Sequence, residues 1–110
     1  MINEIAKATG LKLREARHQK PLDTPYGVYM DEVKAGGADG VNCLRTHNYT
    51  LEVYSPTAKD ADEIEAAIED ALDERGIPWE KQGRYWLRDE QRYQEIYEFS
   101  YIEKRRIKNG

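Results

Sequence analysis

Few residues of this 110-residue chain have the chemistry of a catalytic site: one cysteine, Cys43, and two histidines, His18 and His47. A nucleophile and its base must come within hydrogen-bonding distance of each other. On one strand, Cys43 and His47 would stand about 13 Å apart at ~3.3 Å per residue. One cysteine and two irregularly spaced histidines also do not form a zinc pattern. The sequence therefore predicts neither an enzyme nor a metal or cofactor site.

Two further patterns resemble sites without meeting their requirements. Glu65 and Glu69 share a helix face, as a glycosidase pair could, but two carboxylates on an exposed helix are usually just solvated. Gly36, Gly37 and Gly40 do not have phosphate-loop spacing, and a strand rather than a helix follows them. We interpret residues 34–40 as the flexible tip of a hairpin.

Residues 55–77 predict an amphipathic helix of about four to five turns. Thr57 and Asp60 form an approximate capping box, and Gly76 followed by Pro78 ends the helix. The apolar stripe consists of Ala61, Ile64, Ile68, Ala71 and Leu72. The acids expected on the opposite face are Asp62, Glu65, Glu69 and Asp73. The stripe predicts that the helix lies on an apolar surface.

Alternating apolar residues predict four strands around this helix. Residues 26–33 and 43–55 form one hairpin, and residues 79–87 and 93–102 form a second, with Gly83 as a bulge. A short helix at residues 2–9 ends at Gly10, and residues 11–24 are a charged loop with a short extended piece around Leu11 and Leu13. The order is α-β-β-α-β-β. It predicts an α+β fold in which a four-stranded antiparallel sheet carries the central helix on one face.

Length and composition indicate one soluble domain spanning residues 1–110. The chain is 35% charged, and its 10% aromatic content argues against disorder. A single cysteine excludes an internal disulfide and favours a reducing compartment. No segment approaches the ~18 apolar residues of a membrane span. We expect a cytoplasmic protein that does not contact a membrane.

Charge is unevenly distributed along the chain. Residues 57–75 contain eight acids, whereas the first twenty residues and residues 103–110 are rich in Lys and Arg. We expect residues 103–110 to be a flexible basic tail. This segregation suits head-to-tail self-association, although a solvated helix face and a frayed tail explain it equally well. The candidate assembly residues are Lys34, Gly36, Gly37, Asp39, Glu65, Glu69, Asp73, Arg105 and Arg106.

Several short motifs follow one another in a distinctive order. They are Thr9-Gly10, the strand start at Pro25 and Tyr26, Ala38-Asp39, the segment from Asn48 to Tyr54 (NYTLEVY), Lys59-Asp60 and a Tyr-rich last strand. In this order the chain resembles the tail terminator, or tail completion, proteins of long-tailed phages and prophages. The resemblance covers most of residues 2–102, and none of its motifs is catalytic. The charged residues 11–20 and the basic tail depart from the family pattern.

The resemblance implies an α+β subunit that assembles as a hexameric ring on the finished tail tube, stops its polymerisation and receives the head connector. The implied partners are further copies of the chain, the major tail tube protein and the head connector. DNA would be met only as it passes through the ring. The implied location is the host bacterial cytoplasm during assembly and then the tail–head junction of the virion.

Two alternatives remain open. One is a head-closure or neck protein of the phage connector. The other is a nucleic-acid-binding module in which Tyr97, Phe99 and Tyr101 on one sheet face stack on bases beside the basic tail. Interleaved acids, such as Glu98, oppose the second alternative. A sheet face covered by the helix stripe would make these rings core, whereas an open face would make them a binding platform.

Overall fold

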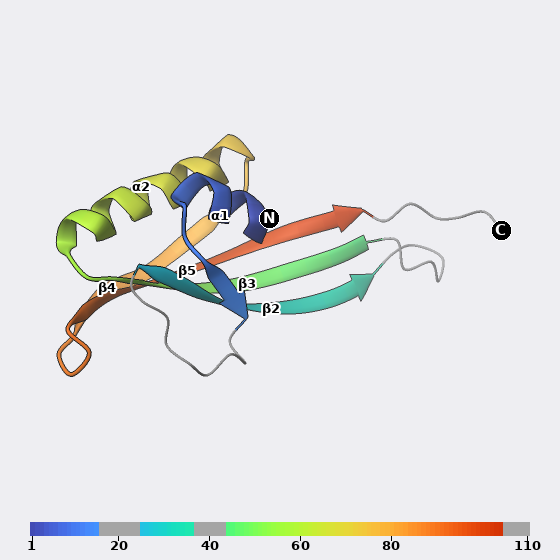
Figure 1. The fold of residues 1–110 in the computed structure, drawn as a ribbon. Helices are drawn as coiled ribbons and strands as arrows, with labels where there is room; N and C mark the ends of the chain where they lie inside the picture. Colours follow the sequence, from blue (N-terminus) through green and yellow to red (C-terminus); the bar gives the residue numbers. More distant parts are fainter. Residues whose placement is uncertain (16–24, 37–43, 105–110) are drawn as a thin grey trace.

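The computed structural model describes residues 1–15, 25–36 and 44–104. Two helices lie on one face of a five-stranded sheet (Figure 1). In chain order the elements are α1 (Ile2–Thr9), β1 (Leu13–Glu15), β2 (Tyr26–Gly36), β3 (Leu44–Ser55), α2 (Ala58–Glu74), β4 (Trp79–Leu87) and β5 (Arg92–Lys104). The predicted α+β class and its single central helix are confirmed.

The sheet has the order β1-β2-β3-β5-β4, and β1 runs parallel to β2 while every other pair is antiparallel. The predicted four-stranded antiparallel sheet is therefore wrong at one edge. With three residues, β1 is too short to show an alternating pattern. It docks where Gly27 lacks a side chain, because a Cβ at Gly27 would lie 2.4 Å from Cδ2 of Leu13.

The first hairpin is longer than predicted. Residues 34–36, assigned to the flexible tip, continue β2 and pair with residues 44–46 of β3. Cross-strand pairing compensates for the low strand propensity of the glycine at position 36, which sequence patterns cannot show. The rest of the predicted tip, including Gly37 and Asp39, lies outside the described residues, as do Cys43, His18 and the tail residues Arg105 and Arg106. Residues 103 and 104, which were assigned to the flexible tail, instead continue β5.

The ends of both helices follow the predicted chemistry. The Thr57 hydroxyl accepts a hydrogen bond from the backbone N–H of Asp60 at 3.1 Å, which caps α2. Gly76 and Gly10 adopt φ values of 64° and 72°, the left-handed conformation that ends a helix. The stripe of α2 is buried: Ile68 and Leu72 are fully enclosed and pack in one cluster with the sheet.

The helices cover the aromatic face that the nucleic-acid alternative requires. Tyr97 is 0% exposed and Phe99 is 4% exposed, and both belong to the hydrophobic core. Only Tyr101, at the far end of β5, remains open on this face. The predicted stacking platform is wrong, because α2 uses these rings as core.

Three strands continue beyond the helices (Figure 1). β1 pairs only with residues 27–29 of β2, and β4 pairs only with residues 92–99 of β5. Past these points, residues 32–36, 44–48 and 100–104 form five three-residue rows. We call this three-stranded extension the finger, and the helix-covered remainder the body. In the described part of the chain, no strand pairs with either outer edge of the finger.

Candidate assembly surfaces

Three acids of α2 contact side chains of the sheet strands. Glu65 contacts two basic side chains of β4, and Glu69 accepts a hydrogen bond from the Tyr97 hydroxyl at 2.7 Å. Asp73 accepts a hydrogen bond from the Trp79 indole at 2.8 Å. The expectation of a solvated outer face is wrong for Glu65 and Glu69, because β4 and β5 pass along this flank of α2, whereas Asp73 is exposed. Their role in assembly stays a prediction.

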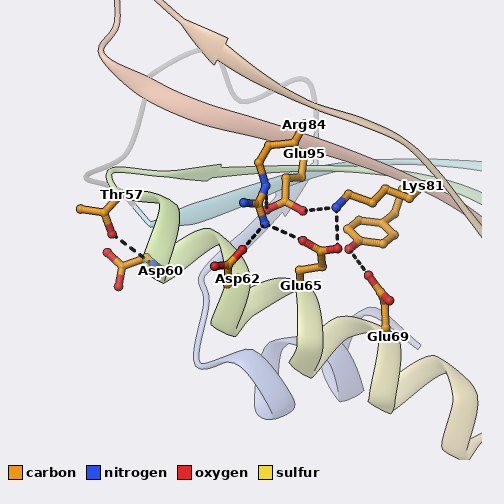
Figure 2. Close-up of polar contacts among 9 residues, drawn as sticks. Thr57, Asp60, Asp62, Glu65, Glu69, Lys81, Arg84 and Glu95 are labelled. Carbon is orange, nitrogen blue, oxygen red and sulfur yellow. Dashed lines mark hydrogen bonds and ion pairs between the residues drawn. The ribbon is translucent and has the colours of Figure 1, made fainter.

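A five-residue ion network joins α2 to the sheet (Figure 2). Lys81 lies 2.6 Å from Glu65 and 3.2 Å from Glu95. Arg84 lies 2.8 Å from Asp62, 2.5 Å from Glu65 and 3.3 Å from Glu95. The side chain of Glu95 is 3% exposed, and its oxygens lie near both cations without hydrogen-bond geometry. Three carboxylates thus surround two cations at the body end of the sheet.

Burial and charge oppose each other inside this network. Burial raises the pKa of Glu95 above its usual value, and the attraction of Lys81 and Arg84 only partly offsets it. For Glu65, burial acts in the same direction, but hydrogen bonds from Lys81 and Arg84 lower its pKa below the usual value. The network therefore ties the helix to the sheet, and only Asp62 among its members is mostly exposed.

The sheet face opposite the helices has no covering element among the described residues. An open groove of about 930 Å³ is lined by residues of β2, β3, β4 and β5, including Met30, Glu32, Glu80 and Glu98. Strand alternation places these four side chains on the helix-free face, because Tyr49, Phe99 and the other core residues point the opposite way. This face is therefore an open and locally acidic surface.

The finger exposes apolar side chains along both edge strands. Val33 on β2 is 45% exposed, and Ile102 on β5 is 60% exposed. Two candidate assembly residues, Lys34 and Gly36, also lie in this part of β2. They belong to a different surface from Glu65, Glu69 and Asp73 of α2, so the structure does not bring the predicted interface residues together.

His47 lies in the middle strand of the finger and makes two contacts that were not predicted from the sequence. Its two ring nitrogens lie 2.8 Å from Asp31 and 3.0 Å from Glu103. The three residues come from three different strands. Only the strand register brings them together, and no local motif marks them in the sequence.

Within residues 1–15, 25–36 and 44–104, no cluster of three His, Cys, Asp or Glu side chains could hold a metal ion. No helix in this part of the chain is long and apolar enough to cross a membrane.

Comparisons with known proteins give matches among solved structures. No family model and no curated protein matches the sequence. Among solved structures, the chain is similar to a component of the "Virion of native gene transfer agent (GTA) particle". The match has a TM-score of 0.47 and 16% identity, and it covers 90% of this chain and 84% of that chain.

Proposed function

We propose that the protein is a structural subunit of a phage-like virion that assembles into a ring on the end of the tail tube. Its role is to stop tube polymerisation and to present the surface that the head connector meets. Two observations support this: the ordered motifs that resemble tail terminator proteins, and a finger suited to contacts between copies. The structural argument for the proposal is that the finger has two open strand edges. The role is structural and not catalytic.

The two edges of the finger are suited to a head-to-tail contact. β2 and β5 are both antiparallel to β3, so they run in the same direction. The β2 edge of one copy would therefore pair with the β5 edge of the next copy as parallel strands. An open strand edge is a template for pairing with another chain. Because the two edges differ, the contact is heterologous, and such contacts close into a ring when the rotation between copies allows it.

Apolar burial would add to the backbone pairing. Val33 and Ile102 stand on the two edge strands and are about half exposed or more in the single chain. Covering such side chains is favourable by roughly 25 cal/mol per Å² of apolar surface. The acids Glu65, Glu69 and Asp73 already have partners within the chain, so we assign the subunit contact to the finger rather than to α2.

Substitutions that introduce a charge into the finger test whether the finger forms the contact between subunits. Val33→Asp and Ile102→Asp each place a carboxylate where the contact would be dry, and we expect at least a tenfold loss in self-association by sedimentation velocity. Tyr85→Asp is the matched control, because Tyr85 is 48% exposed on β4 in the body. The control should assemble like the unmodified protein. Equal assembly of all four proteins would contradict the proposal.

Electron microscopy with the cognate tail tubes then separates the related roles. A ring at one end of each tube, lost in Val33→Asp and kept in Tyr85→Asp, supports tail capping. A ring that binds the head connector but ignores the tube supports the head-closure alternative instead.

A further inference from the structure

Three strands of the finger are joined through one side chain. His47 lies on the middle strand β3, and its Nδ1 is 2.8 Å from a carboxylate oxygen of Asp31 on β2. Its Nε2 is 3.0 Å from a carboxylate oxygen of Glu103 on β5. The side chain of His47 is 15% exposed, whereas those of Asp31 and Glu103 are 22% and 40% exposed, so the ring is mostly shielded and its two partners keep part of their contact with water.

The geometry specifies the protonation state of the ring. A neutral imidazole has one N–H donor and one acceptor nitrogen, whereas a carboxylate only accepts. With a carboxylate oxygen at each nitrogen, a neutral ring would satisfy one contact and repel at the other. Only the imidazolium donates to both Asp31 and Glu103, and such charge-assisted hydrogen bonds are the strong ones.

Two tyrosines and an arginine complete the surroundings of the His47 ring. Tyr49 stacks on His47 with ring centroids 5.6 Å apart, and burial raises the pKa of Tyr49 to about 12. Tyr101 of β5 lies 6.2 Å from the ring on the same face. Arg45, two residues before His47 on β3, is opposite Glu103 in register. Histidine is the residue type in this set whose ordinary pKa lies closest to neutral pH.

We propose that protonated His47 is a clamp that holds β2, β3 and β5 of the finger together, and that the finger loosens when His47 loses its proton. In the helix-covered body, α1 and α2 hold the strands whatever the pH. In the finger, where no described element covers the sheet, the clamp adds a cross-strand contact to the backbone ladder. This inference does not depend on the proposed function.

The sign of the pH dependence follows from the contacts. Burial alone would lower the pKa of His47, but the hydrogen bonds and charges of Asp31 and Glu103 raise it above 6.5. The stabilisation is fully present below the unfolded-state pKa of about 6.5. It is lost as the pH rises through the folded-state value. Each unit by which the folded pKa exceeds the unfolded one corresponds to about a tenfold loss of protection.

Hydrogen exchange across pH 5.5–9, corrected for intrinsic rates, measures the clamp directly. We expect protection of residues 32–36 and 100–104 to fall as pH rises, while protection of α2 and the body strands stays constant. His47→Gln should remove the pH dependence and give low finger protection at every pH. The control His18→Gln changes the other histidine of the chain and should keep the wild-type profile.

NMR titration of the His47 ring provides the second measurement. We expect its pKa to lie above 6.5 and to fall in Asp31→Asn, which removes one carboxylate charge. If hydrogen-exchange protection of the finger residues in the wild type did not change with pH, the proposed clamp would be wrong. A ring pKa at or below 6.5, or an unchanged pH profile in His47→Gln, would overturn it as well.

Discussion

The body and the finger are two ends of one sheet, held together in different ways. In the body, α1 and α2 enclose a continuous core in which Leu51, Ile68 and Tyr97 are fully buried. In the finger, the described residues include no helix that covers these three strands and no further strand that pairs with their outer edges. Stability therefore resides in the body, whereas backbone edges and apolar side chains are available in the finger. Strand pairing continues through both regions, so the covering elements make the difference.

The ionic contacts of the two regions differ in the same way. Lys81 and Arg84 of the body have pKa values that burial would lower but that their carboxylate partners raise, so both remain cations over the accessible pH range. In the finger, Asp31 and Glu103 raise the pKa of His47 above its ordinary value against the effect of burial. The two cations of the body network are therefore constant, whereas the cation of the finger contact can lose its charge. The largest difference in stability that we expect between the two regions concerns the core of the body.

Leu72→Ala should be the most damaging single change to stability. Leu72 is fully buried in the stripe of α2, and truncation of such a residue leaves a cavity that costs about 2–5 kcal/mol. Ile102→Ala in the finger should cost less than about 0.5 kcal/mol, because that side chain is 60% exposed. Urea denaturation followed by circular dichroism gives both values. Comparable losses at the two positions would refute the contrast between body and finger.

Lys81→Met tests whether the body network contributes to stability. The nearly buried carboxylate of Glu95 would lose one of its two cations, and we expect a loss of about 1–3 kcal/mol. The deficit should grow as pH rises above about 4.3, because a carboxyl with a raised pKa is stabilising while protonated and loses that contribution on ionisation.

A double-mutant cycle completes this test. Glu95→Gln removes the buried charge, so adding it to Lys81→Met should recover part of the loss. Lys59→Met, an exposed change in the first turn of α2, is the control and should be within about 0.5 kcal/mol of the wild type. A pH-independent deficit in Lys81→Met would show that only packing of the lysine stem was lost.

The sequence predicted the elements whose signals are local. The cap at Thr57, the stops at Gly10 and Gly76, and the bulge at Gly83 all follow from chemistry within a few residues, and each is confirmed. Trp86 and Tyr93 form a cross-strand pair in the second hairpin, with ring centroids 4.8 Å apart. Local rules worked here because turn and cap geometry depends on neighbouring residues.

The errors concern contacts between residues far apart in the chain. β1 depends on the absence of a side chain at Gly27, and no pattern within residues 11–15 shows that. Glu65 was assigned to solvent because helical periodicity separates apolar from polar residues but does not show which strand lies beside the polar flank. The His47 contacts likewise combine residues 16 and 56 positions away in the chain. A single sequence contains no signal for such pairs.

The smallest predicted effect tests whether the body and the finger open as separate units. Thr57→Ala removes the hydroxyl that accepts the Asp60 N–H and should cost about 1 kcal/mol, while Thr57→Ser, which keeps the acceptor, should cost much less. In hydrogen exchange, a loss of 1 kcal/mol raises amide exchange of α2 about fivefold. Exchange in residues 32–36 and 100–104 should not change, because the finger opens without unfolding the helix. An equal increase in both regions would mean that helix and finger unfold as one cooperative unit, and the finger would then have no independent order for His47 to control.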